Sequence, residues 1–191
     1  MTFNCIIAGV GGQGTVLASK LIAAAAMKKG FDARTTETIG MAQRGGSVFG
    51  HIRIGDNIFS PLVPLGKADA IIAFEPSEAV RQLPYLSKNG IVISCGGAVQ
   101  PAGTGGAYEV SVMMDCLKSN APRLVIINGA KLKDQNPKTL NVCLLGAAAQ
   151  SGIFPFDADT LKDILIETLP VRYHDINIKA FESGRSLIPG K

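Results

Sequence analysis

Residues 9–14 read Gly9-Val10-Gly11-Gly12-Gln13-Gly14, and they lie between a short apolar run, Phe3 to Ala8, and a helical pattern that begins near Thr15. A strand, a glycine-rich turn and a helix in this order point several backbone N–H groups at one spot, where the helix N-terminus adds partial positive charge. The spacing is that of G-x-G-x-x-G, which occurs at dinucleotide and phosphate sites. The stretch therefore predicts a Rossmann-like first turn, which either cradles a ligand or packs tightly beneath its helix. The Gln13 amide either bonds that ligand or caps local backbone groups.

Apolar runs of strand length alternate with helical patterns along the rest of the chain. The expected strands lie at residues 3–8, 33–36, 47–54, 70–74, 91–94 and 124–127, with a turn at 55–57 before a return strand from 58. The expected helices begin near Thr15, at Glu75-Pro76-Ser77, at Leu140, after Asp157 or Asp159 as a cap, and near Asp175. This alternation indicates a mostly parallel sheet in a three-layer α/β/α fold. We see no internal repeat or linker, and we expect one domain over residues 1–191.

Four polar or glycine-rich segments directly follow expected strands. They are Gly9 to Gly14, Glu37 to Gly46, Glu75, and Cys95-Gly96-Gly97. Ligands of parallel sheets bind at the carboxyl ends of the strands. We therefore expect these four segments to share one edge of the sheet.

Glu37 and Arg44 are the charged candidates at that edge. A Rossmann site places a carboxylate about 20 residues beyond the glycines, on the ribose hydroxyls, and Glu37 is suited to that role unless it is a solvated turn residue or half of an interface salt bridge. Arg44 precedes two glycines and can grip a carboxylate or phosphate with two parallel bonds, or it forms an ion pair at an interface. The full candidate ligand-binding set is Gly9, Gly11, Gly12, Gln13, Gly14, Glu37, Gln43, Arg44, Gly45 and Gly46.

The alternating strand at residues 47–54 predicts an outward face. Phe49, His51 and Arg53 lie on that face, opposite the apolar side chains of the same strand. Because no second histidine or thiol is near His51 in the sequence, we interpret it as an interface or core-edge residue. With the Arg44-Gly45-Gly46 segment, this face is the expected contact region for another chain.

The composition excludes several classes of function for the chain alone. The net charge of +4 comes from scattered basic residues, which does not indicate a nucleic-acid stripe. The four cysteines are far apart in the sequence and there are only two histidines, so we expect neither an iron–sulfur cluster nor a metal site. The N-terminus lacks a basic signal region and no apolar run is long enough to span a membrane, so we expect a cytoplasmic protein.

The sequence contains no recognisable set of catalytic residues. We find no nucleophile elbow, no Walker lysine, no metal triad and no acid–base pair. The chain is therefore either a binding module or a subunit whose chemistry another chain completes.

Motifs along nearly the whole chain carry a resemblance to a known family. They are Gly9 to Gly14, Met41 to Val48, His51, Arg53, Ser60-Pro61, Gly66, Ala68-Asp69, Phe74-Glu75-Pro76, Asn141, Gly146, Asn177, Ala180-Phe181 and Gly184. The chain resembles the β subunits of indolepyruvate:ferredoxin oxidoreductases, which are equivalent to the γ domain of the wider 2-oxoacid:ferredoxin oxidoreductase family. Met41-Ala42-Gln43 is similar to the indolepyruvate branch. Ile39 departs from the pattern of that branch, which often has a histidine at this position. This departure leaves the exact substrate subtype open.

The resemblance implies a division of labour between two chains. A larger α subunit holds thiamine pyrophosphate and [4Fe–4S] clusters and passes electrons to ferredoxin, while this chain binds no cofactor alone and is inactive alone. The implied reaction is oxidative decarboxylation of an aryl 2-oxoacid with coenzyme A, which gives an arylacetyl-CoA, CO2 and reduced ferredoxin. The glycine-rich edge of this chain helps position the 2-oxoacid or coenzyme A. Two alternatives stay open: a Rossmann-type oxidoreductase that binds NAD or FAD, with Glu37 on the ribose, and a non-catalytic scaffold.

Overall fold

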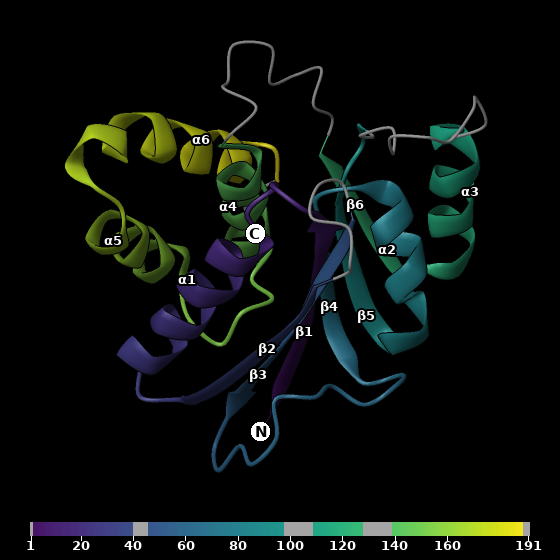
Figure 1. Cartoon of the computed structure of the whole chain (residues 1–191), viewed down its shortest axis with the longest axis horizontal. Helices are drawn as coiled ribbons and strands as arrows, with labels where there is room; N and C mark the ends of the chain where they lie inside the picture. The colour runs from purple at the N-terminus through teal and green to yellow at the C-terminus, as the bar shows by residue number, and fades with distance from the viewer. Residues whose placement is uncertain (1, 40–45, 98–108, 128–138, 189–191) are drawn as a thin grey trace.

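The computed structural model describes residues 2–39, 46–97, 109–127 and 139–188, which form one mixed sheet with helices on both faces (Figure 1). The six strands are β1 (Phe3–Val10), β2 (Asp32–Ile39), β3 (Ser47–Gly55), β4 (Ala68–Ala73), β5 (Leu86–Cys95) and β6 (Arg123–Ile127). Their order in the sheet is β2-β3-β1-β4-β5-β6. The expected α/β architecture is confirmed.

Strands β1, β4, β5 and β6 are parallel neighbours, whereas β3 runs antiparallel between β1 and β2. Because β2 is antiparallel to β3, it points the same way as β1. The carboxyl ends of five strands and the start of β3 therefore meet at one edge, as the sequence predicted. We call this edge the carboxyl end of the sheet, and the opposite edge the amino end.

In the part of the chain that the structure describes, helices lie on both faces of the sheet (Figure 1). The first layer contains α1 (Thr15–Lys28), α4 (Leu140–Gln150), α5 (Ala158–Thr168) and α6 (His174–Ser186). The second contains α2 (Pro76–Gln82) and α3 (Val110–Asn120). Each face buries its own apolar cluster, because successive strand residues such as Ile6 and Ile7 point to opposite sides. This is the three-layer arrangement that the alternation of strands and helices predicted.

The helix ends follow the capping signals in the sequence. Gly30 adopts a left-handed φ of 86° just beyond α1, as a glycine after a helix C-terminus does. The Asp157 carboxylate accepts a 2.7 Å bond from the N–H of Thr160 and caps α5. Between the two predicted candidates, the N-cap is Asp157, and Asp159 lies inside the first turn.

Three local predictions differ from the structure. Helix α3 was not predicted, because it is only slightly apolar overall and only Leu117 of its residues is buried. The return strand expected from Ile58 is wrong, because residues 58–67 run as an irregular segment. Strand β5 begins at Leu86 rather than Ile91, because its exposed first half carries no apolar run. Within the described residues, no helix is both long and apolar enough to cross a membrane.

Candidate functional site

The turn after β1 uses glycines where the backbone is left-handed. Gly12 has a φ of 98° and Gly14 has a φ of 82°, conformations that side chains with a Cβ rarely adopt. Gly14 is also the N-cap of α1. Because glycine has no side chain, it provides no side-chain acceptor for the N–H groups of the first helical turn. Because no acidic residue lies in this described first turn, the partial positive charge of the helix end stays available to an anion.

The Gln13 side chain holds this turn closed. Its Oε1 accepts a 2.8 Å bond from the N–H of Val10, and its Nε2 donates at 3.5 Å to the carbonyl of Phe74. The N–H of Gln13 donates to the Val10 carbonyl at 3.1 Å. Between the two roles left open by the sequence, the structure supports the local cap. Gln13 therefore positions the turn and ties it to the end of β4.

Close packing explains the first and last glycines of the turn. A Cβ at Gly9 would lie 2.7 Å from Gln13 Oε1 and 3.2 Å from the Phe74 ring. A Cβ at Gly14 would collide with the side-chain amide of Asn141, a buried residue at the start of α4. At Gly12, in contrast, no atom of the described residues beyond its two chain neighbours lies within 4 Å of the position that a Cβ would take. Among the described residues, the turn is thus packed beneath its helix at Gly9 and Gly14 and uncovered at Gly12.

The second segment of the candidate site is only partly described. The carbonyl of Gly46 accepts a 2.9 Å bond from the N–H of Gly11, which joins the start of β3 to the glycine turn. Gln43, Arg44 and Gly45 lie outside the described residues. The observed bond brings the end of this segment to the carboxyl end of the sheet.

Glu37 lies inside β2, opposite Gly50 of β3, rather than beyond the end of a short strand. Strand β3 separates β2 from β1, so Glu37 is two strand spacings, about 10 Å, from the strand that carries the glycine turn. In a Rossmann site the ribose carboxylate follows the strand next to β1. The sheet order therefore counts against Glu37 as a ribose ligand.

Two buried carboxylates, Glu75 and Glu78, lie at the same end of the sheet. Glu75 is the N-cap of α2, and it accepts bonds from the N–H groups of Ser77 at 2.8 Å and Glu78 at 3.1 Å. Glu78 accepts a 2.5 Å bond from the hydroxyl of Ser47 and lies 3.4 Å from Arg81 Nε. Donors of the chain itself compensate the negative charge of both carboxylates. Their hydrogen bonds hold the N-terminus of α2 in place and attach α2 to the start of β3. The sequence placed Glu75 at this edge, but Glu78 carries no local pattern and was missed.

The thiols at this end are buried and protonated at neutral pH. Burial raises the pKa of Cys95, at the end of β5. Burial also raises the pKa of Cys143, in α4, to about 11. Thiolates, not thiols, ligate metals and attack substrates. No group of three or more potential metal-binding side chains is found among the described residues.

His51 does not face outward as the alternation predicted. Its side chain is 4% exposed and lies between the rings of Phe49 and Tyr85, with centroids at 5.5 and 5.2 Å. Its Nδ1 accepts a 3.2 Å bond from the N–H of Val63, and burial lowers its pKa. The prediction was wrong because the irregular segment 58–67 covers this face of β3. Between the two interpretations from the sequence, an interface residue or a core-edge residue, the burial of His51 within this chain supports the second.

Chemically, the carboxyl end provides a helix N-terminus, an open glycine and a closed network of hydrogen bonds. Such an arrangement can bind and orient an anionic group. The carboxylates described at this end accept hydrogen bonds from the chain itself, and the thiols of Cys95 and Cys143 are protonated. The geometry therefore suits a binding surface.

Comparison with known proteins extends over nearly the whole chain. Residues 4–187 match the family of pyruvate ferredoxin/flavodoxin oxidoreductases. The chain is 35% identical over 189 residues to the indolepyruvate oxidoreductase subunit IorB of Pyrococcus horikoshii, with 95% of this chain and 94% of that protein covered. It is 38% identical over 190 residues to the subunit of the same name from Archaeoglobus fulgidus, with coverage of 96% and 94%.

A solved structure has the same fold. It is the 2-oxoglutarate:ferredoxin oxidoreductase of Magnetococcus marinus with 2-oxoglutarate, coenzyme A and succinyl-CoA bound, which matches with a TM-score of 0.72 at 19% identity. The likeness covers 97% of this chain and 31% of that chain. The fold thus also occurs as one part of a much longer polypeptide.

Proposed function

Because the chain belongs to the pyruvate ferredoxin/flavodoxin oxidoreductase family, we propose that it is a subunit of an indolepyruvate-type 2-oxoacid:ferredoxin oxidoreductase. The enzyme oxidatively decarboxylates an aryl 2-oxoacid with coenzyme A and forms an arylacetyl-CoA and CO2. Each turnover releases one proton and two electrons, which reduce ferredoxin. The observation that carries the proposal is the likeness to two IorB subunits over more than nine-tenths of both chains.

In this proposal a larger partner chain carries thiamine pyrophosphate and [4Fe–4S] clusters, which supply the carbon chemistry and the electron transfer. The present chain binds and positions, and it is inactive alone. The wide spacing of the four cysteines in the sequence supports this division, because cluster ligands are thiolates in closely spaced runs. The whole chain acts as one domain of the assembly, in the cytoplasm.

The proposed role of the carboxyl end is to hold the anionic part of coenzyme A or of the 2-oxoacid. Gly12 and the first turn of α1 present N–H groups and partial positive charge, while Gln13 fixes the shape of the turn. Arg44, together with Gln43 and Gly45, follows the carboxyl end of β2 in the sequence and adds a guanidinium to the proposed site. Glu37 belongs to this proposal only as a neighbour of the site, because of its distance from β1.

The segment 58–67 is the proposed contact surface for the larger chain. It exposes three large apolar side chains, Phe59 (94%), Leu62 (59%) and Leu65 (66%). Two hydrogen bonds attach the segment to β3: Arg53 donates to the Ser60 carbonyl at 3.1 Å, and the N–H of Val63 donates to His51. A cluster of exposed apolar side chains on a fixed backbone is typical of a protein interface.

Size-exclusion chromatography of the co-expressed pair tests the contact. We expect the wild-type chain to elute with the larger chain as one species. The variants Phe59→Ser and Leu65→Ser should weaken association at least tenfold, about 1.4 kcal/mol, and Val112→Ser on exposed α3 should not. Unchanged association in both segment variants, with the wild-type complex intact, would place the interface elsewhere.

Arg44→Lys tests the ligand role of the carboxyl end. Lysine keeps the charge but loses the planar fork, so we expect a rise of about tenfold in the KM for coenzyme A or the 2-oxoacid, with assembly intact. Weakened assembly with an unchanged KM would make Arg44 an interface residue. Unchanged values in both assays would remove Arg44 from the site.

A further inference from the structure

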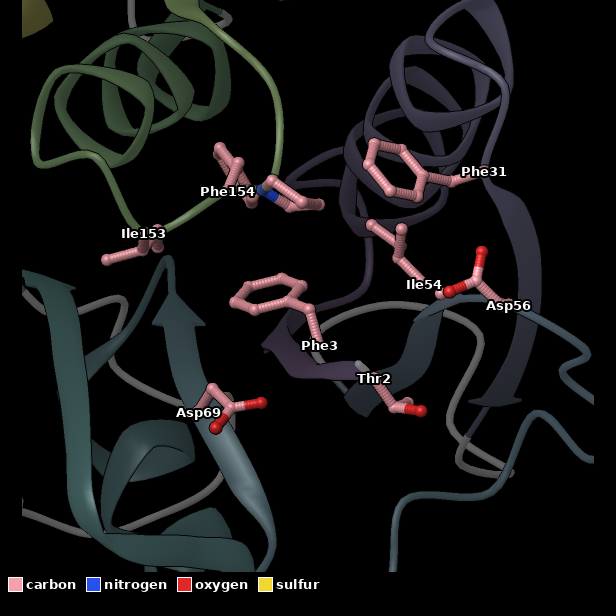
Figure 2. Close-up of a pocket in the computed structure, with 10 residues that line it drawn as sticks. Thr2, Phe3, Phe31, Ile54, Asp56, Asp69, Ile153 and Phe154 are labelled. Atoms are coloured by element: carbon pink, nitrogen blue, oxygen red, sulfur yellow. The ribbon is translucent and has the colours of Figure 1, made fainter.

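A cavity of about 480 Å³ lies at the amino end of the sheet. It is at the opposite end of β1 from the glycine turn. We call it the aromatic cleft. Phe3 of β1, Ile54 of β3, Phe31 before β2 and the connection from α4 to α5 contribute its lining (Figure 2). The eight residues of β1 lie between the cleft and the glycine turn, and they span about 26 Å at the usual rise of a strand. An occupant of the cleft therefore does not compete with a ligand at the carboxyl end.

The wall of the cleft is built from aromatic rings. Phe3 and Phe154 meet edge to face, with centroids 5.7 Å apart and planes at 75°. Phe154 in turn stacks on Phe156 at 4.9 Å. In Figure 2 the rings of Phe3 and Phe31 border the same space, with Ile153 and Phe154 beside it. A preformed apolar space of this size suits a flat ring or a large apolar group.

A smaller polar cavity of about 280 Å³ adjoins the aromatic cleft and shares Phe3, Asp69 and Ile153 with it. Its further lining includes Asn89, Arg123 and Ser151. The sheet order explains the grouping, because Asp69, Asn89 and Arg123 lie at the amino ends of the neighbouring strands β4, β5 and β6. A carboxylate and a guanidinium thus lie in a row beside the ring-binding space.

The two charges of the polar cavity are open to a ligand. One Asp69 oxygen accepts a 2.8 Å bond from the N–H of Asn4, and this carboxylate lines both cavities. Among the described residues, neither Asp69 nor Arg123 takes part in an ion pair. The lining of the aromatic cleft is mostly apolar but also includes the Asp56 carboxylate. Beyond the rings, a ligand meets the Asp69 carboxylate, which both cavities share, and then the Arg123 guanidinium of the polar cavity.

We propose that the aromatic cleft and its polar neighbour bind a zwitterionic α-amino acid with an aromatic or large apolar side chain. The side chain occupies the space between Phe3, Phe31 and Phe154. The α-ammonium group donates to Asp69, and the α-carboxylate accepts from Arg123. The corresponding 2-oxoacid has no ammonium group and would place only negative charge beside Asp69. The site therefore distinguishes the amino acid from the 2-oxoacid proposed as substrate, and it stands independently of the proposed function.

Calorimetric titration of the full chain with three probes of equal ring size tests the assignment. L-Phenylalanine carries both charges, phenylpyruvate only the carboxylate, and 2-phenylethylamine only the ammonium. We expect L-phenylalanine to bind at least about tenfold more tightly than either of the others. Equal binding of the three probes, or no binding of L-phenylalanine, would overturn the proposal.

Two variants test the charged residues separately. Asp69→Asn keeps an oxygen for the Asn4 N–H, and it should remove the preference over phenylpyruvate. Arg123→Gln should remove the preference over 2-phenylethylamine. Arg172→Gln is the control, because Arg172 is exposed over the Tyr173 ring near α6 and should leave all three affinities unchanged. Binding insensitive to both test variants refutes the proposal, as does exclusion of L-phenylalanine by the larger chain, which would make the cleft a subunit contact.

Discussion

The two ends of the sheet are held together by different forces. At the carboxyl end, Gln13, Ser47, Glu75 and Glu78 form directional hydrogen bonds around a turn with left-handed glycines. At the amino end, aromatic rings pack edge to face and in stacks around a cavity. Directional bonds fix where N–H groups point, whereas packing fixes only volume and shape. The carboxyl end is therefore suited to orient a reacting ligand, and the amino end to select an occupant by size and charge.

The largest effect is expected at the amino end. Phe154→Ala removes a buried ring that contacts both Phe3 and Phe156, and should lower the free energy of unfolding by about 3–5 kcal/mol. Urea denaturation measures it. Phe59→Ala, at a ring exposed to solvent, is the control and should cost less than about 0.5 kcal/mol. A small loss for Phe154→Ala would mean that the rings do not stabilise this end.

At the carboxyl end, Gly12→Ala and Gly14→Ala separate backbone strain from packing. Both positions have positive φ, so each alanine should cost about 1–2 kcal/mol in strain. Only Gly14→Ala also meets the Asn141 amide, which should add about 1–3 kcal/mol. The double variant with Asn141→Ala should recover much of that addition in a double-mutant cycle. Equal losses for the two glycines would show that α4 does not press on the turn.

Ser47→Ala tests the directional network without changing the backbone. It removes the hydroxyl that donates to the buried Glu78 carboxylate, and should cost about 1–3 kcal/mol. Ser119→Ala is the matched control, because that exposed hydroxyl bonds only to a carbonyl within α3, and should change stability by less than about 0.5 kcal/mol. Thermal unfolding of both variants in one buffer gives the difference. Similar small shifts would argue against a structural role for the Ser47–Glu78 bond.

The smallest effect concerns a polar contact near the aromatic end. Bonds from Lys29 and then Thr160 hold the pKa of Asp157 well below its ordinary value of 3.8. Asp157→Ala should cost about 1 kcal/mol at pH 7 through the lost helix cap. A carboxyl group whose pKa is lowered in the folded state stabilises the fold fully at pH values above its ordinary pKa. This contribution decreases as the pH falls below that ordinary pKa towards the pKa of the folded state. The gap between wild type and variant should thus shrink between pH 5 and pH 3, and a gap that stays constant over this range would contradict the stabilising role of the Asp157 carboxylate.

The sequence predicted the glycine turn and the start of α2 at the carboxyl end because these features are local. Glycines at Gly9, Gly12 and Gly14 between a strand and a helix indicate the turn directly, and Pro76 after Glu75 marks the start of α2. The strand order was not predictable, because the alternation of strands and helices does not reveal that β3 inserts antiparallel between β1 and β2. This insertion is what moves Glu37 away from β1.

The aromatic cleft was not predicted at all. Phe3, Phe31 and Phe154 are far apart in the sequence, and each is an ordinary apolar residue in its own segment. Only the fold brings them together. Likewise, the outward face predicted for His51 depended on strand periodicity alone, which cannot show that segment 58–67 returns across it.

We propose that this chain contributes to an oxidoreductase only within an assembly with a larger chain. The most direct measurement is the reduction of ferredoxin by indolepyruvate and coenzyme A, with this chain, the larger chain, and the two together at equal concentrations. We predict reduction by the pair alone, with a dependence on coenzyme A. Reduction by this chain alone, or equal rates for the larger chain with and without it, would contradict the claim.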